Sequence, residues 1–153
     1  MSASTVIPSP PPGARLVPEN IAGLYRMAAE RFGERPAFLT RSASAPGGWS
    51  ATSFTSLYET GLALATALID LGVGQREHVG LLADNRIEWI LCDCGIQLAG
   101  AADVPRGTDI TDAEITHILG HADVEVVFIE NASTLEKFER CRAALPRVRE
   151  VIV

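Results

Sequence analysis

The stretch His78–Arg106, HVGLLADNRIEWILCDCGIQLAGAADVPR, decides the fold on which the rest of the chain builds. Its apolar run Val79–Ala83 lacks polar alternation, which is typical of a strand buried on both faces. Apolar residues then recur at spacings of three and four over Arg86–Leu98, which predicts an amphipathic helix. A second apolar run, Ala101–Val104, is expected to end at Pro105, because proline cannot donate to a sheet ladder. Two strands joined by one crossover helix predict parallel pairing with a right-handed connection.

Capping residues indicate where several helices begin and end. Asp84 and Asn85 offer side-chain oxygens before the central helix, and Gly100 offers a glycine stop after it. The segments Thr111–Glu114 and Ser133–Glu136 both fit the capping-box pattern, in which a hydroxyl and a carboxylate bond each other's backbone amides. The first of these boxes is expected to stabilise its helix by about 1 kcal/mol.

The chain divides into a short tail and one folded unit. Residues 1–18 include five prolines and are expected to form a disordered tail. Residues 19–153 have the composition of a single α/β unit with one sizeable core. Asn20 is placed to cap an amphipathic helix, and Gly33 is placed to end it.

A hairpin and a long helix are expected next. The short runs 37–40 and 49–52 are separated by the loop RSASAPGG, which predicts a β-hairpin. Either Ser53 or Thr55 then begins a helix that extends to about Leu71, with a buried stripe at helical spacing.

The second half of the chain repeats strand and helix. The helix after the first capping box is expected to end at Gly120, and a strand follows over 124–129. Another helix ends before Pro146, and a further strand spans 148–153. From Val79 onward four strands thus alternate with three helices, which predicts an α/β fold with a mostly parallel sheet and helices on both faces. The apolar strand at 151–153 has nothing after it, so either it is an edge strand or more chain follows, and we favour the second explanation.

Composition excludes several classes of function. The net charge of −6 gives no electrostatic reason to expect nucleic acid as a partner. The apolar runs are shorter than the roughly 20 residues of a transmembrane helix, and no secretion signal is evident, so a cytoplasmic protein is expected. The cysteines Cys92, Cys94 and Cys141 fit neither a disulfide framework nor a zinc site, because the first two point apart on the predicted helix.

Two carboxylates and one arginine are candidates for a ligand site. Asp84 and Asp103 both lie near the expected carboxyl ends of adjacent strands, where open α/β sheets bind ligands. The alternative, which we favour, is that Asp84 caps the following helix and Asp103 turns into water. Arg106 on the next loop could meet an anion, but a solvated arginine is the commoner case.

Motifs for catalysis and metal binding are missing. His117 and His121 have the spacing to hold one metal ion on a helix face, but Gly120 is expected to end the helix between them and no third ligand is evident. The sequence has neither a GxSxG nucleophile elbow nor a GxxxxGK[ST] phosphate loop. We therefore predict no metal site and assign no catalytic residue.

A family resemblance rests on three stretches. Trp49, then ALIDLGV at 67–73, then VGLLADNRIEW at 79–89 occur in an order that resembles the start of AMP-forming acyl-CoA synthetases. The stretch AGAADVPRGTD at 99–109 is similar to the long-chain fatty acid CoA ligases within that adenylate-forming superfamily. The similarity covers about residues 21–153.

The resemblance implies a two-step ligase. ATP, with Mg²⁺ as its usual companion, would adenylate a fatty acid carboxylate, and the thiol of CoA would then displace AMP. The family's phosphate loop and its mobile C-terminal domain have no counterpart in these residues. The resemblance therefore implies an incomplete part of the large N-terminal domain of an adenylate-forming enzyme, which alone would be inactive and would bind no cofactor.

The same resemblance suggests where a substrate cleft would lie. Asn85 and Arg106, on the loops after the first two parallel strands, would face a cleft that the remaining chain completes, with the fatty acid as partner. An unpaired terminal strand also leads us to expect a homodimer or self-association of this piece.

Two other classes of protein remain as alternatives. A free-standing flavodoxin-like binding or signalling module would have about this number of strands and helices. A receiver-type domain needs an acidic pocket completed by a lysine, and the only lysine, Lys137, lies within a predicted helix. A pure interaction domain would use the proline-rich tail or the helix after Asn20. We favour the ligase.

Overall fold

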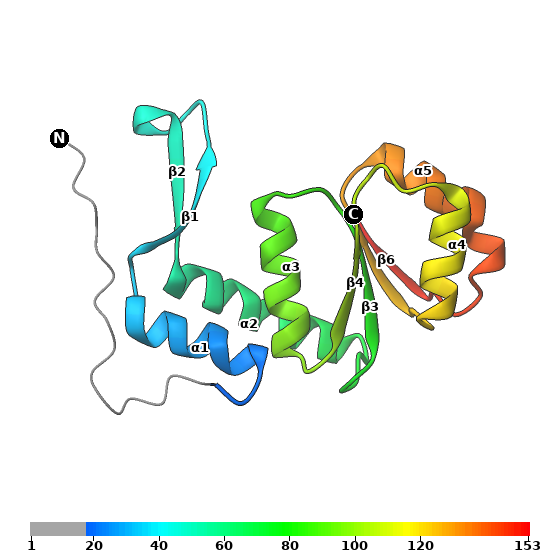
Figure 1. The fold of residues 1–153 in the computed structure, drawn as a ribbon, viewed down its shortest axis with the longest axis horizontal. Coiled ribbons are helices and arrows are strands. Elements are labelled where there is room, and N and C mark those ends of the chain that lie inside the picture. The colour runs from blue at the N-terminus through cyan, green and yellow to red at the C-terminus, as the bar shows by residue number, and fades with distance from the viewer. Residues whose placement is uncertain (1–17) are drawn as a thin grey trace.

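The computed structural model describes residues 18–153, so the tail expected over 1–18 lies, apart from Pro18, outside the described residues. Six strands and five α-helices follow one another along this part of the chain (Figure 1). They are α1 (Ile21–Phe32), β1 (Pro36–Arg41), β2 (Trp49–Ser53), α2 (Phe54–Asp70), β3 (His78–Leu82), α3 (Ile87–Leu98), β4 (Ala102–Arg106), α4 (Asp112–His121), β5 (Val126–Ile129), α5 (Ala132–Cys141) and β6 (Glu150–Ile152).

The central sheet has four strands in the order β4-β3-β5-β6, and every neighbouring pair is parallel. Val79 of β3 lies opposite Asp103 of β4 on one side and Val126 of β5 on the other. Strands β1 and β2 form a separate antiparallel hairpin. The predicted parallel pairing, the hairpin and the alternation of strands with helices are all confirmed.

Helices cover both faces of the sheet, as predicted, with α2 and α3 on one face and α4 and α5 on the other (Figure 1). Successive residues of β3 and β5 point to opposite faces, so each strand contributes to two separate cores. The core under α2 and α3 contains Leu68, Val79, Leu81, Ile96, Val126 and Phe128. The core under α4 and α5 contains Leu82, Ile115, Leu119, Val127, Ile129 and Phe138.

Strand β4 passes through Pro105, although the sequence predicted that the strand would end there. Pro105 lies in register with Leu81 of β3, and Arg106 continues the ladder opposite Leu82. Because β4 is an edge strand with β3 as its single neighbour, a residue whose nitrogen faces outward needs no donor. The prediction was wrong because the sequence does not reveal which strand lies at the edge.

The cap predicted for α3 is also wrong. The N-cap residue is Arg86, and it makes no side-chain capping bond. Asp84, which was expected to cap this helix, instead accepts hydrogen bonds from Thr108 on a neighbouring loop. The Asp84 carboxylate thus bonds to Thr108, which is distant in sequence, rather than to the nearby amides at the start of α3.

Two further boundaries differ from the sequence prediction. Asn131 caps α5 by accepting from the amide of Thr134 at 2.9 Å, so the capping box expected at Ser133 does not form. Helix α4 continues past Gly120 to His121. The capping box at Thr111 is confirmed in both of its hydrogen bonds.

The first helix and the hairpin attach to one end of this assembly. Asn20 caps α1 by accepting from the amide of Gly23 at 2.7 Å, as predicted. Ser53, rather than Thr55, caps α2. Helix α1 has no buried residue. It packs against α2 through the rings of Phe32 and Phe54, whose centroids lie 4.9 Å apart. In residues 18–153 no helix has both the length and the hydropathy to cross a bilayer.

Helices α2 and α3 approach so closely that glycine is required where they meet. A Cβ atom placed on Gly95 would lie 2.6 to 2.8 Å from the Cδ2, Cγ and Cβ atoms of Leu64. The Cβ of Leu64 cannot rotate away, so the helices themselves would have to separate.

We predict that Gly95→Ala lowers the free energy of unfolding by about 1–3 kcal/mol, the usual effect of overpacking a core. Gly120→Ala is the matched control, because its added methyl would meet Leu145 at an ordinary 3.6 Å and alanine favours a helix. Urea unfolding measures both variants. A Gly95→Ala protein as stable as the wild type would contradict the close approach.

Candidate functional site

The carboxyl ends of β3 and β4 open into a cleft of about 610 Å³. Asp84 and Asn85 line it from the loop after β3, and Arg106 and Gly107 line it from the end of β4. Trp89 contributes from the first turn of α3. The two residues assigned to a cleft on the basis of sequence, Asn85 and Arg106, therefore lie at the same edge of the sheet.

Two hydrogen bonds between Asp84 and Thr108, which we call the clasp, join the two loops that line this cleft. The Asp84 carboxylate accepts from the amide of Thr108 at 2.8 Å and from its hydroxyl at 2.7 Å. These two hydrogen bonds lower the pKa of Asp84, because they favour the charged carboxylate. The ammonium group of Lys137, on α5, also binds this loop, donating to the carbonyls of Thr108 and Ile110 at 2.8 and 3.1 Å.

The arginines at this edge are already paired with acids. Arg106 contacts Glu114 at 3.0 Å. Arg86 contacts Glu88 at 2.6 Å and Glu130 at 3.2 Å. Glu130 also accepts from the amide of Asp84 at 2.7 Å, which ties the turn after β3 to the end of β5. The edge of the sheet is thus nearly charge-neutral and does not present a free cluster of cations.

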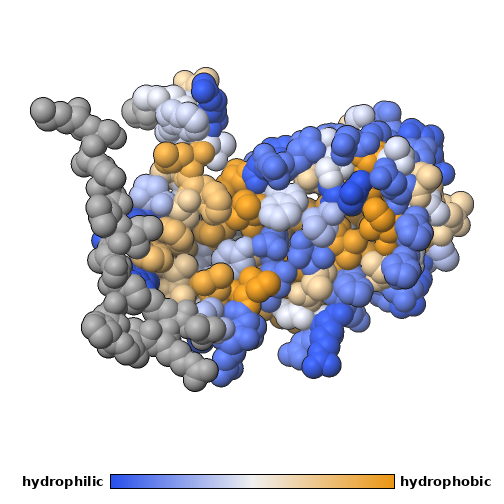
Figure 2. All heavy atoms as spheres, viewed as in Figure 1, coloured by the Kyte–Doolittle hydropathy of each residue, from blue (hydrophilic) through white to orange (hydrophobic). Residues whose placement is uncertain are grey.

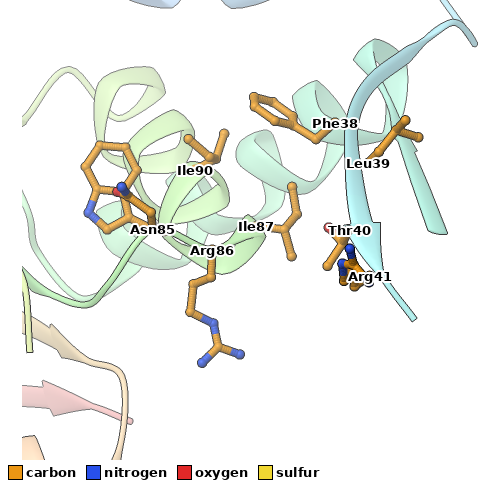
Figure 3. A pocket seen from close by; sticks show the side chains of 9 residues that line it. Phe38, Leu39, Thr40, Arg41, Asn85, Arg86, Ile87 and Ile90 are labelled. Carbon is orange, nitrogen blue, oxygen red and sulfur yellow. The ribbon is translucent and has the colours of Figure 1, made fainter. Parts of the chain in front are cut away.

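A second cavity of about 410 Å³ adjoins the cleft and shares Asn85 and Trp89 with it. Figure 3 shows Phe38 of β1 and the side chains of Ile87 and Ile90 turned toward the space between hairpin and α3, whereas Arg86 points away. The lining of this second cavity is mainly apolar.

The paired-carboxylate site considered from the sequence does not form. Asp84 follows the end of β3, but Asp103 lies opposite Val79, near the start of the parallel strands. Nor does Asp103 turn into water, as we had favoured. It is partly buried and accepts from the side-chain amide of Gln97 at 2.9 Å. The error arises because β4 begins one residue later and ends two residues later than the predicted strand, so Asp103 lies nearer to its start.

The two histidines of α4 lie on one side of the helix, because the helix continues through Gly120. The rings of His117 and His121 stack with centroids 5.8 Å apart. Among residues 18–153 no three histidine, cysteine or acidic side chains converge on one point. The arrangement therefore offers a metal ion at most two ligands in the described part of the chain.

The cysteines of α3 are unsuited to nucleophilic chemistry. Burial raises the pKa of Cys92 to about 11 and that of Cys94 to about 12, and nearby acids add to both shifts. At neutral pH both groups are thiols, whereas the thiolate is the reactive form.

Comparison with known families identifies the fold. A family model described as AMP-binding enzyme matches residues 25–153. The chain belongs to this family of AMP-binding enzymes. The match includes every element from the middle of α1 onward, and thus both loops of the cleft.

Curated relatives of this AMP-binding enzyme chain include two fatty acid CoA ligases. The long-chain-fatty-acid–CoA ligase heimdall of Drosophila melanogaster is 26% identical over 136 residues, which are 88% of this chain and 20% of that protein. The long-chain-fatty-acid–CoA ligase ACSBG2 of Rattus norvegicus is 29% identical over 120 residues, which are 78% and 18% of the respective chains. The chain thus spans about a fifth of the length of these relatives.

Solved structures share the same fold. A long-chain-fatty-acid–CoA ligase, FadD1 of Archaeoglobus fulgidus, superposes with a TM-score of 0.78 at 24% identity, covering 90% of this chain and 28% of that one. The anthranilate CoA ligase AuaEII, solved with anthranoyl-AMP, gives a TM-score of 0.77 at 24% identity and covers 88% and 25%. At this identity the likeness concerns the fold alone.

Sequence reasoning missed three residues that build the edge of this AMP-binding enzyme chain. Thr108, Glu130 and Lys137 all bond across loops, over separations of 24 to 46 residues. The one available signal was the position of Thr108 directly after Gly107, in a loop that follows a strand. Partners so far apart in the chain leave no local pattern.

We predict that Asp84→Ala destabilises the protein at neutral pH and that the difference from the wild type disappears in acid. The pKa of Asp84 is lowered in the folded state, so its contribution is present above the ordinary value of about 3.9 and is lost as pH falls through the folded-state pKa. Urea midpoints measured across pH test this. Thr108→Val should lower the stability less, since the backbone amide of residue 108 can still donate to Asp84. A difference in stability between Asp84→Ala and the wild type that does not change with pH would contradict the clasp.

Proposed function

We propose that this chain is the N-terminal part of an ATP-dependent fatty acid CoA ligase. The complete enzyme would convert a fatty acid, ATP and CoA into acyl-CoA, AMP and pyrophosphate through an acyl-adenylate. The observation that carries the proposal is the family match over residues 25–153, together with relatives that are long-chain-fatty-acid–CoA ligases. In this proposal residues 19–153 form a cytoplasmic α/β subdomain that the remaining chain completes.

The described residues do not themselves fit ATP. A phosphate cradle needs backbone amides presented by a glycine-rich turn between strand and helix. The turns after β3 and β5 contain no glycine, and the carboxylates of Asp84 and Glu130 already accept hydrogen bonds from backbone amides. In the proposal ATP, Mg²⁺ and CoA are therefore held by chain outside these residues.

The role left for this segment is to support the active centre. The clasp between Asp84 and Thr108 and the tie between Glu130 and the Asp84 amide fix the loops at one edge of the sheet. Asn85 and Arg106, at the ends of β3 and β4, are among the residues that line the cleft. We assign them the role of shaping one wall of the substrate cleft.

The flavodoxin-like module gains no support. A receiver-type site would bring the lysine to an acidic pocket, but Lys137 donates to two backbone carbonyls of the loop after β4. Asp84, which would be the acid of such a pocket, already accepts a hydrogen bond from the hydroxyl of Thr108.

The proposal predicts that the full-length protein forms acyl-CoA and AMP from a fatty acid, ATP and CoA, and that residues 1–153 alone do not. Chromatography of the thioester and of AMP measures the first reaction. Calorimetry of the 153-residue chain with Mg²⁺ and ATP should show no binding heat. Full-length protein that forms no thioester with short, medium or long acyl chains, or turnover by the 153 residues unaided, would overturn the proposal.

In the full-length enzyme Asn85→Ala and Arg106→Ala should each lower kcat/KM roughly two- to tenfold, the loss expected when a hydrogen bond worth about 0.5–1.5 kcal/mol is removed. Glu114→Gln is the matched control for Arg106. It breaks the same ion pair, while glutamine still completes the capping box at Thr111. Unchanged kinetics in both cleft variants, or an equal loss in Glu114→Gln, would remove the assigned role.

A further inference from the structure

Two histidines lie side by side on α4. His117 and His121 are four residues apart, a spacing that places both side chains on one face of an α-helix. The sequence prediction of no metal site rested partly on Gly120, which was expected to end the helix between them. The structure removes that reason, because α4 continues through Gly120 to His121. The two rings stack with centroids 5.8 Å apart and an angle of 17° between their planes.

Both imidazoles of this pair are available to a ligand. His117 and His121 are exposed, and within residues 18–153 neither ring makes a hydrogen bond or an ion pair. The remaining histidine of the chain, His78, already has a partner, because its Nδ1 lies 2.8 Å from the carbonyl oxygen of Ala122. A neutral imidazole keeps one nitrogen lone pair that can bind a metal ion. His117 and His121 therefore offer two nitrogen ligands from adjacent turns of one helix.

The face of α4 that carries the pair is a polar surface. Within residues 18–153 the exposed large hydrophobic side chains lie on α1, α2, the hairpin and the last residue, and none lies on α4. Figure 2 shows hydrophobic residues reaching the surface where α1, α2 and the hairpin meet. His121 is also the last residue of α4, and the C-terminal end of a helix favours a cation. This face therefore suits a hydrated cation better than an apolar partner.

The chemistry of the two ligands selects the kind of ion. Neutral imidazole suits Cu²⁺, Ni²⁺ and Zn²⁺, whereas Mg²⁺ and Ca²⁺ prefer oxygen ligands. Among these transition-metal ions Cu²⁺ binds a given nitrogen site most tightly. Because both side chains are exposed, small rotations bring one nitrogen of each ring to the roughly 2.0–2.1 Å at which imidazole binds Zn²⁺, and Cu²⁺ needs a similar approach.

We propose that His117 and His121 chelate a divalent transition-metal ion on the surface of α4, with Cu²⁺ bound most tightly. Two protein ligands fill only part of the coordination shell, so water or a small chelator supplies the rest. The site is separate from the substrate cleft. The cleft lies at the carboxyl ends of β3 and β4, near the start of α4, whereas the pair lies in the second half of that helix. The inference is thus independent of the proposed ligase activity.

The probe that tests the site is Cu²⁺ held by iminodiacetate, which leaves coordination positions open for two imidazoles. Electron paramagnetic resonance during a titration of the 153-residue protein should show hyperfine splitting from two imidazole nitrogens. His117→Gln and His121→Gln should each weaken binding at least about tenfold, because a second tethered ligand acts at a high effective concentration. Glutamine is a good helix former, so α4 should persist in both variants.

His78→Gln is the matched control, because it makes the same replacement at the histidine outside the pair. It should bind the probe as the wild type does. Urea unfolding gives a second measurement, since a ligand that binds the folded state stabilises it. The probe should raise the urea midpoint of the wild type and of His78→Gln, and should raise it much less in either pair variant.

Three results would each refute the histidine pair as a metal site. The first is wild-type protein that does not bind the probe. The second is wild-type affinity in His117→Gln or in His121→Gln. The third is a loss of binding in His78→Gln as large as the loss in the pair variants.

Discussion

The structure depends on the burial of β3 on both of its faces. Val79 and Leu82 have no exposed surface, and Leu81 has 1%. Val79 and Leu81 point to one face of the sheet and Leu82 points to the other. A strand with two apolar faces is stable only if helices cover each of them and other strands satisfy both of its edges. The parallel neighbours β4 and β5 and the two helical layers all meet this single requirement.

The same requirement places chemistry at the two ends of the strands. Because β3, β4 and β5 are parallel, their carboxyl ends meet at one edge, and the loops there carry polar residues that need not be buried. This edge is held by long-range hydrogen bonds from Thr108, Glu130 and Lys137. Its arginines are paired with acids, which suits a wall of a binding cleft better than a centre that binds phosphate.

The opposite end of the sheet behaves differently. There helix α1 contains no buried residue, and the hydroxyl of Tyr25 donates a hydrogen bond to the carboxylate of Asp93 on α3. The edge at the cleft is held by salt bridges and by hydrogen bonds between loops, whereas α1 at the other end contains no buried residue. An element with few buried contacts opens at a lower free-energy cost than one that is well buried.

The sequence by itself determined the fold class, because apolar strands and amphipathic helices have periods that depend only on nearby residues. It also placed Asn85 and Arg106 at one edge, since parallel strands bring their carboxyl ends together. Only the tertiary structure decided that Pro105 lies within an edge strand and that Asp84 bonds Thr108 rather than α3. The hydrogen bond from Gln97 to Asp103 likewise depends on the register of β4 against β3 and on how α3 packs over it. Such choices are set by competition between partners distant in sequence, and no local pattern records the outcome.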